Sequence, residues 1–367
     1  MIRTLIKDRI SFDKYNKLEQ EIYKLFVNNC KDIKDFLWKT TQSLSQYSGA
    51  STCFSRLSSL GIDLEFVNST ALFGMAQICQ NIEDLKIWFY NGNISGLIMF
   101  LDNQKNLRSL YLYFKGSEKQ CIELSEVIEK KADTLKELSI KPNITLISPK
   151  FLPSLINLQY LELYNKIELE EEIVEMEEWE NYLSISTFPN LQYIKTLFLP
   201  ICSDYKLIEK SHENILEIKI YRRYEDQDSI YTEKLIKAIA NHCPKIERLT
   251  INAELKNLNG IKEILLNCSR LKRIDLSAYN EKRLNCDELL EVLVNFSSNT
   301  LYIFSFIDNW NFSVNSLKSF FENWKDKHPI IFIESFDEGD WFLEHKMIVK
   351  KYIDEGVIKK TNCLLMM

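Results

Sequence analysis

The chain has 367 residues, of which 46% are hydrophobic and 27% charged, so it can bury a substantial core and exceeds the usual size of one compact domain. Its net charge of −6 argues against general binding to nucleic acid, because that affinity comes from clustered Lys and Arg residues that release counterions. No stretch approaches the roughly 20 consecutive apolar residues that span a bilayer, so we expect neither nucleic acid nor a membrane among the partners.

The amino-terminal end, residues 1–19, is expected to form a lead-in or a truncated cap. Charged residues such as Arg3 and Lys7 interrupt its apolar residues, so it lacks the apolar run of a secretory signal. Nine cysteines are spread along the chain, and an odd, dispersed set does not form the framework of a small disulfide-rich domain. We therefore expect reduced thiols and a cytoplasmic or nuclear location.

A pattern of the form apolar-x-x-apolar-x-apolar recurs along the chain. Successive copies begin 23 to 33 residues apart, with Leu191 taken as the start of a copy whose frame is ambiguous. Such spacing is typical of leucine-rich repeats, in which a short strand is followed by a helix that returns the chain to the next strand. In chain order the eleven copies are Ile33-Phe36-Trp38, Leu57-Leu60-Ile62, Ile82-Leu85-Ile87, Leu107-Leu110-Leu112, Leu135-Leu138-Ile140, Leu158-Leu161-Leu163, the ambiguous copy at 191–199, Ile215-Ile218-Ile220, Ile246-Leu249-Ile251, Leu271-Ile274-Leu276 and Leu301-Phe304-Phe306.

The segments between these copies have apolar residues three and four positions apart, which is typical of amphipathic helices. Strands that alternate with helices form a parallel sheet. We therefore predict the α/β class, as a leucine-rich-repeat solenoid of about eleven repeats over residues 20–335. A curved parallel sheet would form its concave face and helices its convex face.

An acidic insertion stretches the interval after Leu158. Its apolar residues, among them Trp179 and Leu183, keep helical spacing, so we predict a long convex helix with a solvated acidic face. The alternative is a docking site for a basic partner. The glutamates concerned are Glu168, Glu170, Glu171, Glu172, Glu175, Glu177, Glu178 and Glu180.

The carboxyl-terminal end is expected to seal the array, since a solenoid exposes apolar repeat faces at its ends. Pro329 to Phe336 resembles a final strand, and an amphipathic helix is predicted around His345 to Ile353, after Trp341 and Phe342. We assign residues 336–367 to this cap.

Cysteine precedes the first apolar position of four copies by three residues, at Cys30, Cys79, Cys243 and Cys268. With the segment from His242 to Ile251, this pattern resembles the cysteine-containing repeats of the F-box/leucine-rich-repeat family, and the Tyr-, Lys- and Asn-rich composition resembles its expanded fungal members. The resemblance covers the repeat portion only, because Met1 to Leu18 contain no Leu-Pro start of an F-box. We expect the cysteines themselves to be buried apolar residues, since free Cys packs as a small hydrophobe.

The resemblance implies a substrate-recognition protein of an SCF ubiquitin ligase, whose F-box binds the Skp adaptor while the repeats capture the target. The alternative is a free-standing repeat scaffold or decoy that binds protein targets without recruiting a ligase.

Known catalytic motifs are missing from the sequence. The four histidines lie in no zinc-protease, nucleophile-elbow or phosphate-loop context, and the nine glycines form no glycine-rich loop that opens a helix. Short metal-ligand pairs are missing as well. We therefore expect no enzymatic activity, no cofactor and no metal.

The outward positions of the predicted strands carry large aromatic and basic side chains. Tyr, Trp and Arg dominate interface hot spots because they combine apolar area with a polar group. The alternative is that tyrosine suits strands and stacks on its neighbours. A basic column, with Arg222 and Arg223 beside it, favours an acidic or phosphorylated peptide as one ligand. The predicted partner-binding residues are Trp88, Tyr111, Tyr113, Tyr160, Tyr164, Lys219, Tyr221, Arg248 and Arg273.

Overall fold

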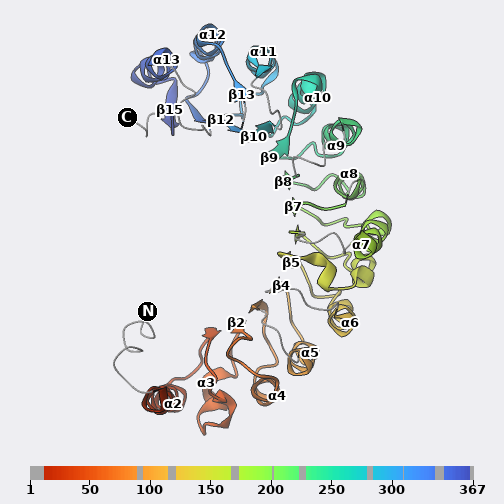
Figure 1. The fold of residues 1–367 in the computed structure, drawn as a ribbon, viewed down its shortest axis with the longest axis vertical. Coiled ribbons are helices and arrows are strands. Elements are labelled where there is room, and N and C mark those ends of the chain that lie inside the picture. Colours follow the sequence, from red (N-terminus) through yellow and green to blue (C-terminus); the bar gives the residue numbers. More distant parts are fainter. Residues whose placement is uncertain are drawn as a thin grey trace. The chain divides into compact units, whose positions relative to one another are not determined.

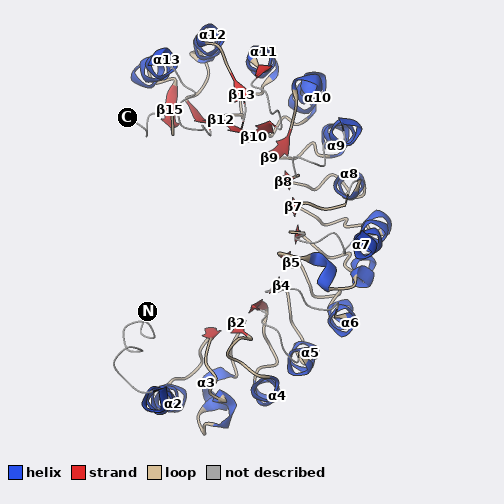
Figure 2. Cartoon of the chain, viewed as in Figure 1, coloured by secondary structure: helices blue, strands red, loops and turns tan. Residues whose placement is uncertain are grey.

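The structure is a computed structural model that describes residues 12–88, 94–114, 121–166, 173–200, 202–222, 229–278, 284–308, 310–334 and 343–363. The chain divides into two compact units, Met1–Asn157 (unit 1) and Leu158–Met367 (unit 2). In both units strands alternate with helices along the chain (Figures 1 and 2).

Unit 1 contains a parallel sheet in which strand order follows chain order, from β1 to β5. Its elements are α2 (Phe12–Asn29), β1 (Asp35–Trp38), η1 (Leu44–Gln46), α3 (Ala50–Phe54), β2 (Ser59–Asp63), α4 (Ser69–Ile78), β3 (Asp84–Trp88), α5 (Ser95–Asp102), β4 (Ser109–Tyr113), α6 (Ile122–Lys130), β5 (Glu137–Lys141), η2 (Ile144–Leu146) and η3 (Pro149–Ser154).

Unit 2 contains a parallel sheet in the order β6-β7-β8-β9-β10-β12-β14-β15, and β11 pairs with β13 separately. Its elements are β6 (Tyr160–Tyr164), α7 (Ile173–Ile185), β7 (Tyr193–Leu197), α8 (Ser203–Glu209), β8 (Glu217–Tyr221), α9 (Ser229–His242), β9 (Arg248–Asn252), η6 (Leu255–Asn257), α10 (Leu258–Asn267), β10 (Arg273–Ala278), β11 (Leu284–Asn285), α11 (Asp287–Phe296), β12 (Ile303–Asp308), β13 (Trp310–Asn311), α12 (Val314–Trp324), β14 (Ile330–Glu334), α13 (Leu343–Asp354) and β15 (Ile358–Thr361).

The repeat positions stack on one another from strand to strand. In unit 1, Leu60, Leu85, Leu110 and Leu138 pair in register across β2 to β5, and all four are buried. Each repeat thus completes its core with apolar residues of its neighbours. The regular parallel strands, the in-register core and the intervening helices confirm the α/β leucine-rich-repeat fold.

Among the described residues, the helices lie on one face of the sheet in each unit and leave the other face without a helix (Figure 1). Neighbouring helices need about 8–10 Å between their axes, whereas strands lie about 4.8 Å apart. Each unit therefore curves with the helices on its convex side. We call the opposite, concave side of each sheet its open face.

The ambiguous copy resolves to strand β7, with Leu191 and Ile194 buried at the first two repeat positions. The third position is Thr196, which is also buried. The third repeat position is apolar in the other copies and polar here, which explains why the sequence pattern alone could not align this copy with the motif.

The helix predicted in the acidic insertion is α7, whose residues Trp179 and Leu183 are fully buried. Glu168, Glu170, Glu171 and Glu172 lie outside the described residues. A docking role for the acidic face therefore stays untested.

The two ends of the chain carry further elements. Helix α2 precedes the first strand, and residues 1–11 lie outside the described part. At the other end, the predicted strand and helix are β14 and α13, and β15 adds a parallel strand beside β14. Trp341 and Phe342 lie outside the described residues. The proposed division at 19/20 and 335/336 stays a prediction.

Candidate functional site

The open face of unit 1 displays three rows of side chains, because alternate residues of each strand point away from the core. Register places the members of a row side by side on neighbouring strands. The first row is Asp35, Ser59, Asp84, Ser109 and Glu137; the second is Leu37, Gly61, Lys86, Tyr111 and Ser139; the third continues from Asp63 through Trp88, Tyr113 and Lys141.

Trp88, Tyr111 and Tyr113 lie together on this face, as predicted. The rings of Trp88 and Tyr113 stack with centroids 5.7 Å apart and an interplanar angle of 11°. The ammonium of Lys141 lies 5.5 Å from the centroid of the Tyr113 ring, and that of Lys86 lies 5.4 Å from Tyr111. Such cation–π contacts hold the rings in place.

Gly61 is a residue of this face that the sequence analysis missed. A β-carbon at this position would lie 2.8 Å from Leu37 Cδ1 and 3.0 Å from Trp88 Cζ3. Leu37 on β1 and Trp88 on β3 therefore approach each other over β2, which lacks a side chain there. The sequence did contain a sign of this arrangement, because a glycine within a predicted strand often marks a place where other groups approach closely.

Carboxylates alternate with serines in the first row of unit 1. Asp84 forms an ion pair with Lys86 at 3.7 Å, and Glu137 accepts a hydrogen bond from the Tyr111 hydroxyl. Burial raises the pKa of the Asp84 carboxyl; Lys86 lowers that pKa, and the carboxylates of Glu137 and Asp35 raise it again. Negative charge therefore accumulates along this row.

Tyr160 and Tyr164 lie on β6 of unit 2, on either side of Glu162. The carboxylate of Glu162 is 3% exposed and lies 3.0 Å from Lys195 Nζ, whose ammonium is 5.2 Å from the centroid of the Tyr164 ring. The Tyr160 ring also packs against Tyr193, with centroids 6.3 Å apart. The two tyrosines are thus positioned around a partly buried ion pair.

Burial and the neighbouring carboxylate also shift the ionisation of this group. Burial raises the pKa of the Tyr160 hydroxyl, and Glu162 raises it further. Burial alone would lower the pKa of Lys195, but hydrogen bonding with Tyr164 and Glu162 raises it overall. Lys195 therefore stays charged and Tyr160 stays neutral at physiological pH.

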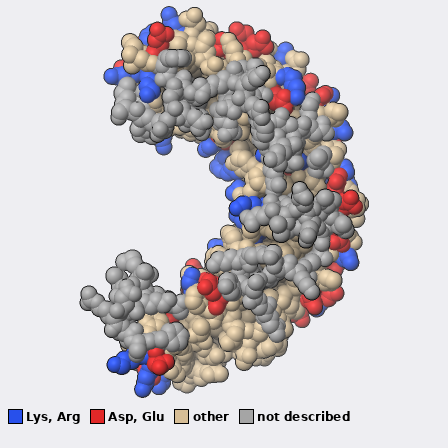
Figure 3. Space-filling model, viewed as in Figure 1, with Lys and Arg blue, Asp and Glu red and all other residues tan. Residues whose placement is uncertain are grey.

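Lys219, Arg248 and Arg273 lie on neighbouring strands of unit 2, as the predicted basic column requires, and Figure 3 shows Lys and Arg side chains on the strand side of β7 to β9. Carboxylates on the same face pair with all three. Glu217 pairs with Lys219 and with Arg248, at 2.9 Å from the latter. Asp275 accepts a bidentate pair of hydrogen bonds from Arg273. This pairing reduces the attraction of the column for an acidic peptide.

Tyr221 is the remaining predicted residue of unit 2 and ends β8, beside this column. It is half-buried. The predicted aromatic stripe therefore falls into a group on unit 1 (Trp88, Tyr111 and Tyr113) and a group on unit 2 (Tyr160, Tyr164 and Tyr221).

The prediction that Arg222 lies beside the basic column is wrong. Its side chain is buried and does not extend the column. Its Nη2 lies 3.0 Å from Asp204 Oδ2, and its guanidinium lies 3.7 Å from the centroid of the Tyr231 ring. The same carboxylate accepts hydrogen bonds from the Tyr231 hydroxyl at 2.6 Å and from Thr196 Oγ1 at 2.8 Å. Arg223 lies outside the described residues.

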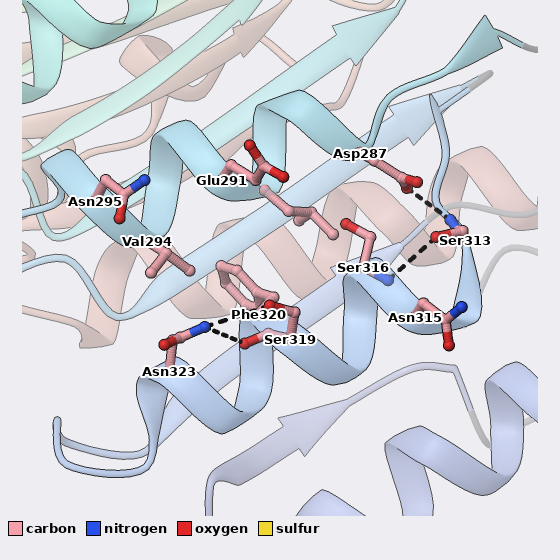
Figure 4. Close-up of a pocket in the computed structure, with 11 residues that line it drawn as sticks. Asp287, Glu291, Val294, Asn295, Ser313, Asn315, Ser316, Ser319, Phe320 and Asn323 are labelled. Atoms are coloured by element: carbon pink, nitrogen blue, oxygen red, sulfur yellow. Dashed lines mark hydrogen bonds between the residues drawn. The ribbon is translucent and has the colours of Figure 1, made fainter.

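Grooves on the convex side separate neighbouring helices. One of about 430 Å³ lies between α11 and α12 (Figure 4). Asp287 at its edge accepts a hydrogen bond from the Ser313 amide at 2.8 Å. Burial alone would raise the pKa of the Asp287 carboxyl, but hydrogen bonds with Ser313, Asn285 and Ser316 lower that pKa overall. Asp287 thus links the start of α11 to the start of α12, which is a structural role.

The described residues contain no cluster of three or more His, Cys, Asp and Glu side chains that could hold a metal. Within the same part of the chain, every helix is too short or too polar to cross a bilayer. The four repeat cysteines are free thiols; Cys79, Cys243 and Cys268 are buried as expected, and Cys30 is half-buried.

Comparison with known proteins gives similarity to solved structures alone, since no protein-family model and no curated protein matches the chain. The leucine-rich repeat-containing protein LegL7 from Legionella pneumophila is 14% identical, with 91% of this chain and 93% of that chain covered and a TM-score of 0.37. A structure of the yeast Rad7 and Elc1 complex is 14% identical over 85% and 87%, with a TM-score of 0.44. A Bacteroides fragilis protein is 16% identical over 71% and 75%, with a TM-score of 0.41.

Proposed function

We propose that the chain is a non-catalytic protein-interaction solenoid that binds a protein target with the open faces of its sheets. The observation that carries this proposal is the one-sided cover of each sheet, which leaves rows of aromatic and charged side chains opposite the helices. The proposed contact residues are Trp88, Tyr111, Tyr113, Tyr160, Tyr164, Lys219, Tyr221, Arg248 and Arg273.

The packing of these side chains supports the proposal. Trp88 and Tyr113 are held in a stack, and the tyrosines of β6 are held around an ion pair. Side chains that are ordered before binding lose little conformational entropy when a partner arrives. Rigid aromatic residues of this kind supply most of the binding energy in protein interfaces.

Alanine variants of the full chain test the open face. A partner identified by cross-linking would be titrated against Tyr111→Ala and Tyr160→Ala, one variant in each unit. At least one of them is expected to weaken binding about tenfold or more, the loss that marks a hot spot. Tyr182→Ala, a half-buried tyrosine on helix α7, is the matched control. Unchanged affinity in both open-face variants would contradict the proposal.

We further propose that this binding serves substrate recognition in an F-box-type SCF ubiquitin ligase, in the cytoplasm or nucleus, as part of ubiquitin-dependent protein degradation. The cysteine-containing repeats and nine free thiols support it. So does helix α2, where Leu18, Ile22 and Leu25 recur at helical spacing and are 44%, 53% and 64% exposed. Such a stripe suits the Skp adaptor, because exposed apolar side chains on one helix face form a groove-binding surface.

Titration of the full chain against the Skp adaptor tests this role. We expect saturable binding that Ile22→Asp abolishes, whereas Leu343→Asp, at a residue 69% exposed on helix α13, leaves it unchanged. Absence of binding at high adaptor concentration would contradict the ligase role. The alternative function, a free-standing scaffold or decoy, would then account for the open faces without ligase recruitment.

A further inference from the structure

An apolar platform crosses the open face of unit 1. It consists of Leu37, Trp88 and Tyr113, which lie on β1, β3 and β4. Leu37 is 57% exposed, an unusual fraction for a leucine in a sheet, and it meets Trp88 over Gly61. The stacked ring of Tyr113 continues the surface. Leu37 is exposed and the rings of Trp88 and Tyr113 are half-buried, so apolar surface stays accessible across the platform, and apolar surface patches of this kind mark interaction sites.

An acidic row runs beside the platform and consists of Asp35, Asp84 and Glu137, on alternate strands. Strand spacing of about 4.8 Å puts successive carboxylates about 10 Å apart. Asp35 accepts a hydrogen bond from Ser59 Oγ at 3.3 Å, and Glu137 accepts one from Tyr111. Both donors are neutral, and among the described residues neither carboxylate is in an ion pair. Their charge is therefore uncompensated.

The cations of this face are already engaged. Lys86 pairs with Asp84, Lys39 lies 3.0 Å from Asp63, and Lys141 lies over the Tyr113 ring. In the corresponding part of unit 2, by contrast, the carboxylates Glu217 and Asp275 are paired with cations, namely Lys219, Arg248 and Arg273. A cation from a partner would thus gain most at the acidic row of unit 1, where Asp35 and Glu137 lie on the same row as Asp84.

We infer that the open face of unit 1 binds an extended segment of a protein partner in which an apolar residue and a Lys or Arg lie two positions apart. The apolar side chain covers Leu37 and Trp88, and the cation meets Asp35. Asp35 and Leu37 are themselves two residues apart on β1, and alternate side chains of an extended segment project to the same side with a matching separation of about 7 Å. This inference rests on the proposed function and specifies the chemistry of its target.

Selection from a displayed library of random peptides against the full chain tests the inference. Peptides with an apolar-x-basic or basic-x-apolar pattern are expected to be enriched. Their affinity should fall as salt is raised, since exposed charges are screened. Enrichment of acidic peptides, or of none, would overturn the inference.

Two pairs of variants then locate the binding of an enriched peptide. Asp35→Lys is expected to weaken it about tenfold or more, whereas Glu126→Lys, the same charge reversal at an exposed position of helix α6, leaves it unchanged. Leu37→Ser is expected to weaken it by a similar factor, and Ile156→Ser, at a residue 51% exposed in the same unit, is its control. These exposed positions can be substituted without loss of the core.

Failure of this inference is distinguishable from failure of the proposed function. Binding lost in Tyr160→Ala but retained in Asp35→Lys and Leu37→Ser would move the site to unit 2 and overturn the inference alone. Partner capture that survives both tyrosine variants would contradict the open faces as a whole.

Discussion

Asp204 holds together a buried polar cluster in unit 2 that includes Thr196, Arg222 and Tyr231. Its carboxylate is 1% exposed and accepts hydrogen bonds from all three. The cluster joins β7, α8 and α9 to the residue that follows β8. A buried charge of this kind stays in place because both of its oxygens are satisfied.

Asp204→Ala is expected to destabilise the chain by about 3–5 kcal/mol, because removing one partner leaves the Arg222 guanidinium buried without its counter-charge. Urea denaturation followed by circular dichroism would measure the loss. Glu209→Ala, at an exposed position of the same helix, should change stability by no more than about 0.5 kcal/mol. Equal effects of the two substitutions would show that the cluster contributes little.

The positions of the open-face residues could be predicted from sequence, because strand alternation alone decides which side chains point away from the core. Trp88, Tyr111 and Tyr160 follow that rule. The prediction was wrong for Arg222, which follows the last residue of β8, where alternation no longer applies. It also missed Gly61, whose role depends on the sizes of residues on two other strands.

At the scale of elements, the repeat pattern located eleven strands because each strand must present two apolar residues to a shared core. The copy at β7 could not be aligned with certainty, because the motif is defined by apolar residues and its third position is Thr196. The hydroxyl of Thr196 is hydrogen-bonded, so this residue is buried as completely as an apolar one. Strand β15 was not predicted. Its segment Ile358–Thr361 contains no copy of the motif and pairs with β14 at the end of the sheet.

Close packing of helices leads to a prediction on glycines. A β-carbon on Gly96 of α5 would lie 2.5 Å from Ser69 Cα, in the backbone of α4, whereas one on Gly74 of α4 would meet only the side chain of Ser45. Gly96→Ala is therefore expected to destabilise the chain by about 1–3 kcal/mol, as overpacking does. Gly74→Ala should be nearly neutral, because Ser45 can rotate and alanine gains about 1 kcal/mol of helix propensity.

Urea denaturation of both glycine variants would measure these effects. Hydrogen exchange of the α4 and α5 amides would show whether the loss is local. A Gly96→Ala variant as stable as the unchanged chain would mean that the two helices can move apart at no cost.

At the scale of the whole chain, each repeat depends on its neighbours, and the carboxyl-terminal end of unit 2 makes this dependence testable. Phe304 of β12 packs edge-on against Phe320 and Trp324 of α12, at centroid distances of 5.6 Å and 5.0 Å. Phe332 of β14 then packs against Phe320 at 6.3 Å. The aromatic core of one repeat is thus closed by the helix that follows its strand.

A chain that ends at Lys327 keeps α12, whereas one that ends at Ser313 loses it and leaves Phe304 uncovered. We expect the first to retain cooperative unfolding and the second to lose more helical circular dichroism than its missing residues account for, because uncovered repeat faces destabilise the repeats before them. Both chains lack β14, which makes them a matched pair. Equal behaviour would indicate that the earlier repeats are stable without this cover.

The in-register pairing of the strands has one more consequence. Since Asp84, Ser109 and Glu137 occupy the same row on successive strands, each open face is a lattice with one column for each repeat and one line for each outward position. A duplicated or exchanged repeat would add or replace a column without disturbing the others. New binding preferences can therefore arise when a repeat is duplicated and only its three outward-facing residues are then changed, while its inward-facing apolar residues keep the core intact.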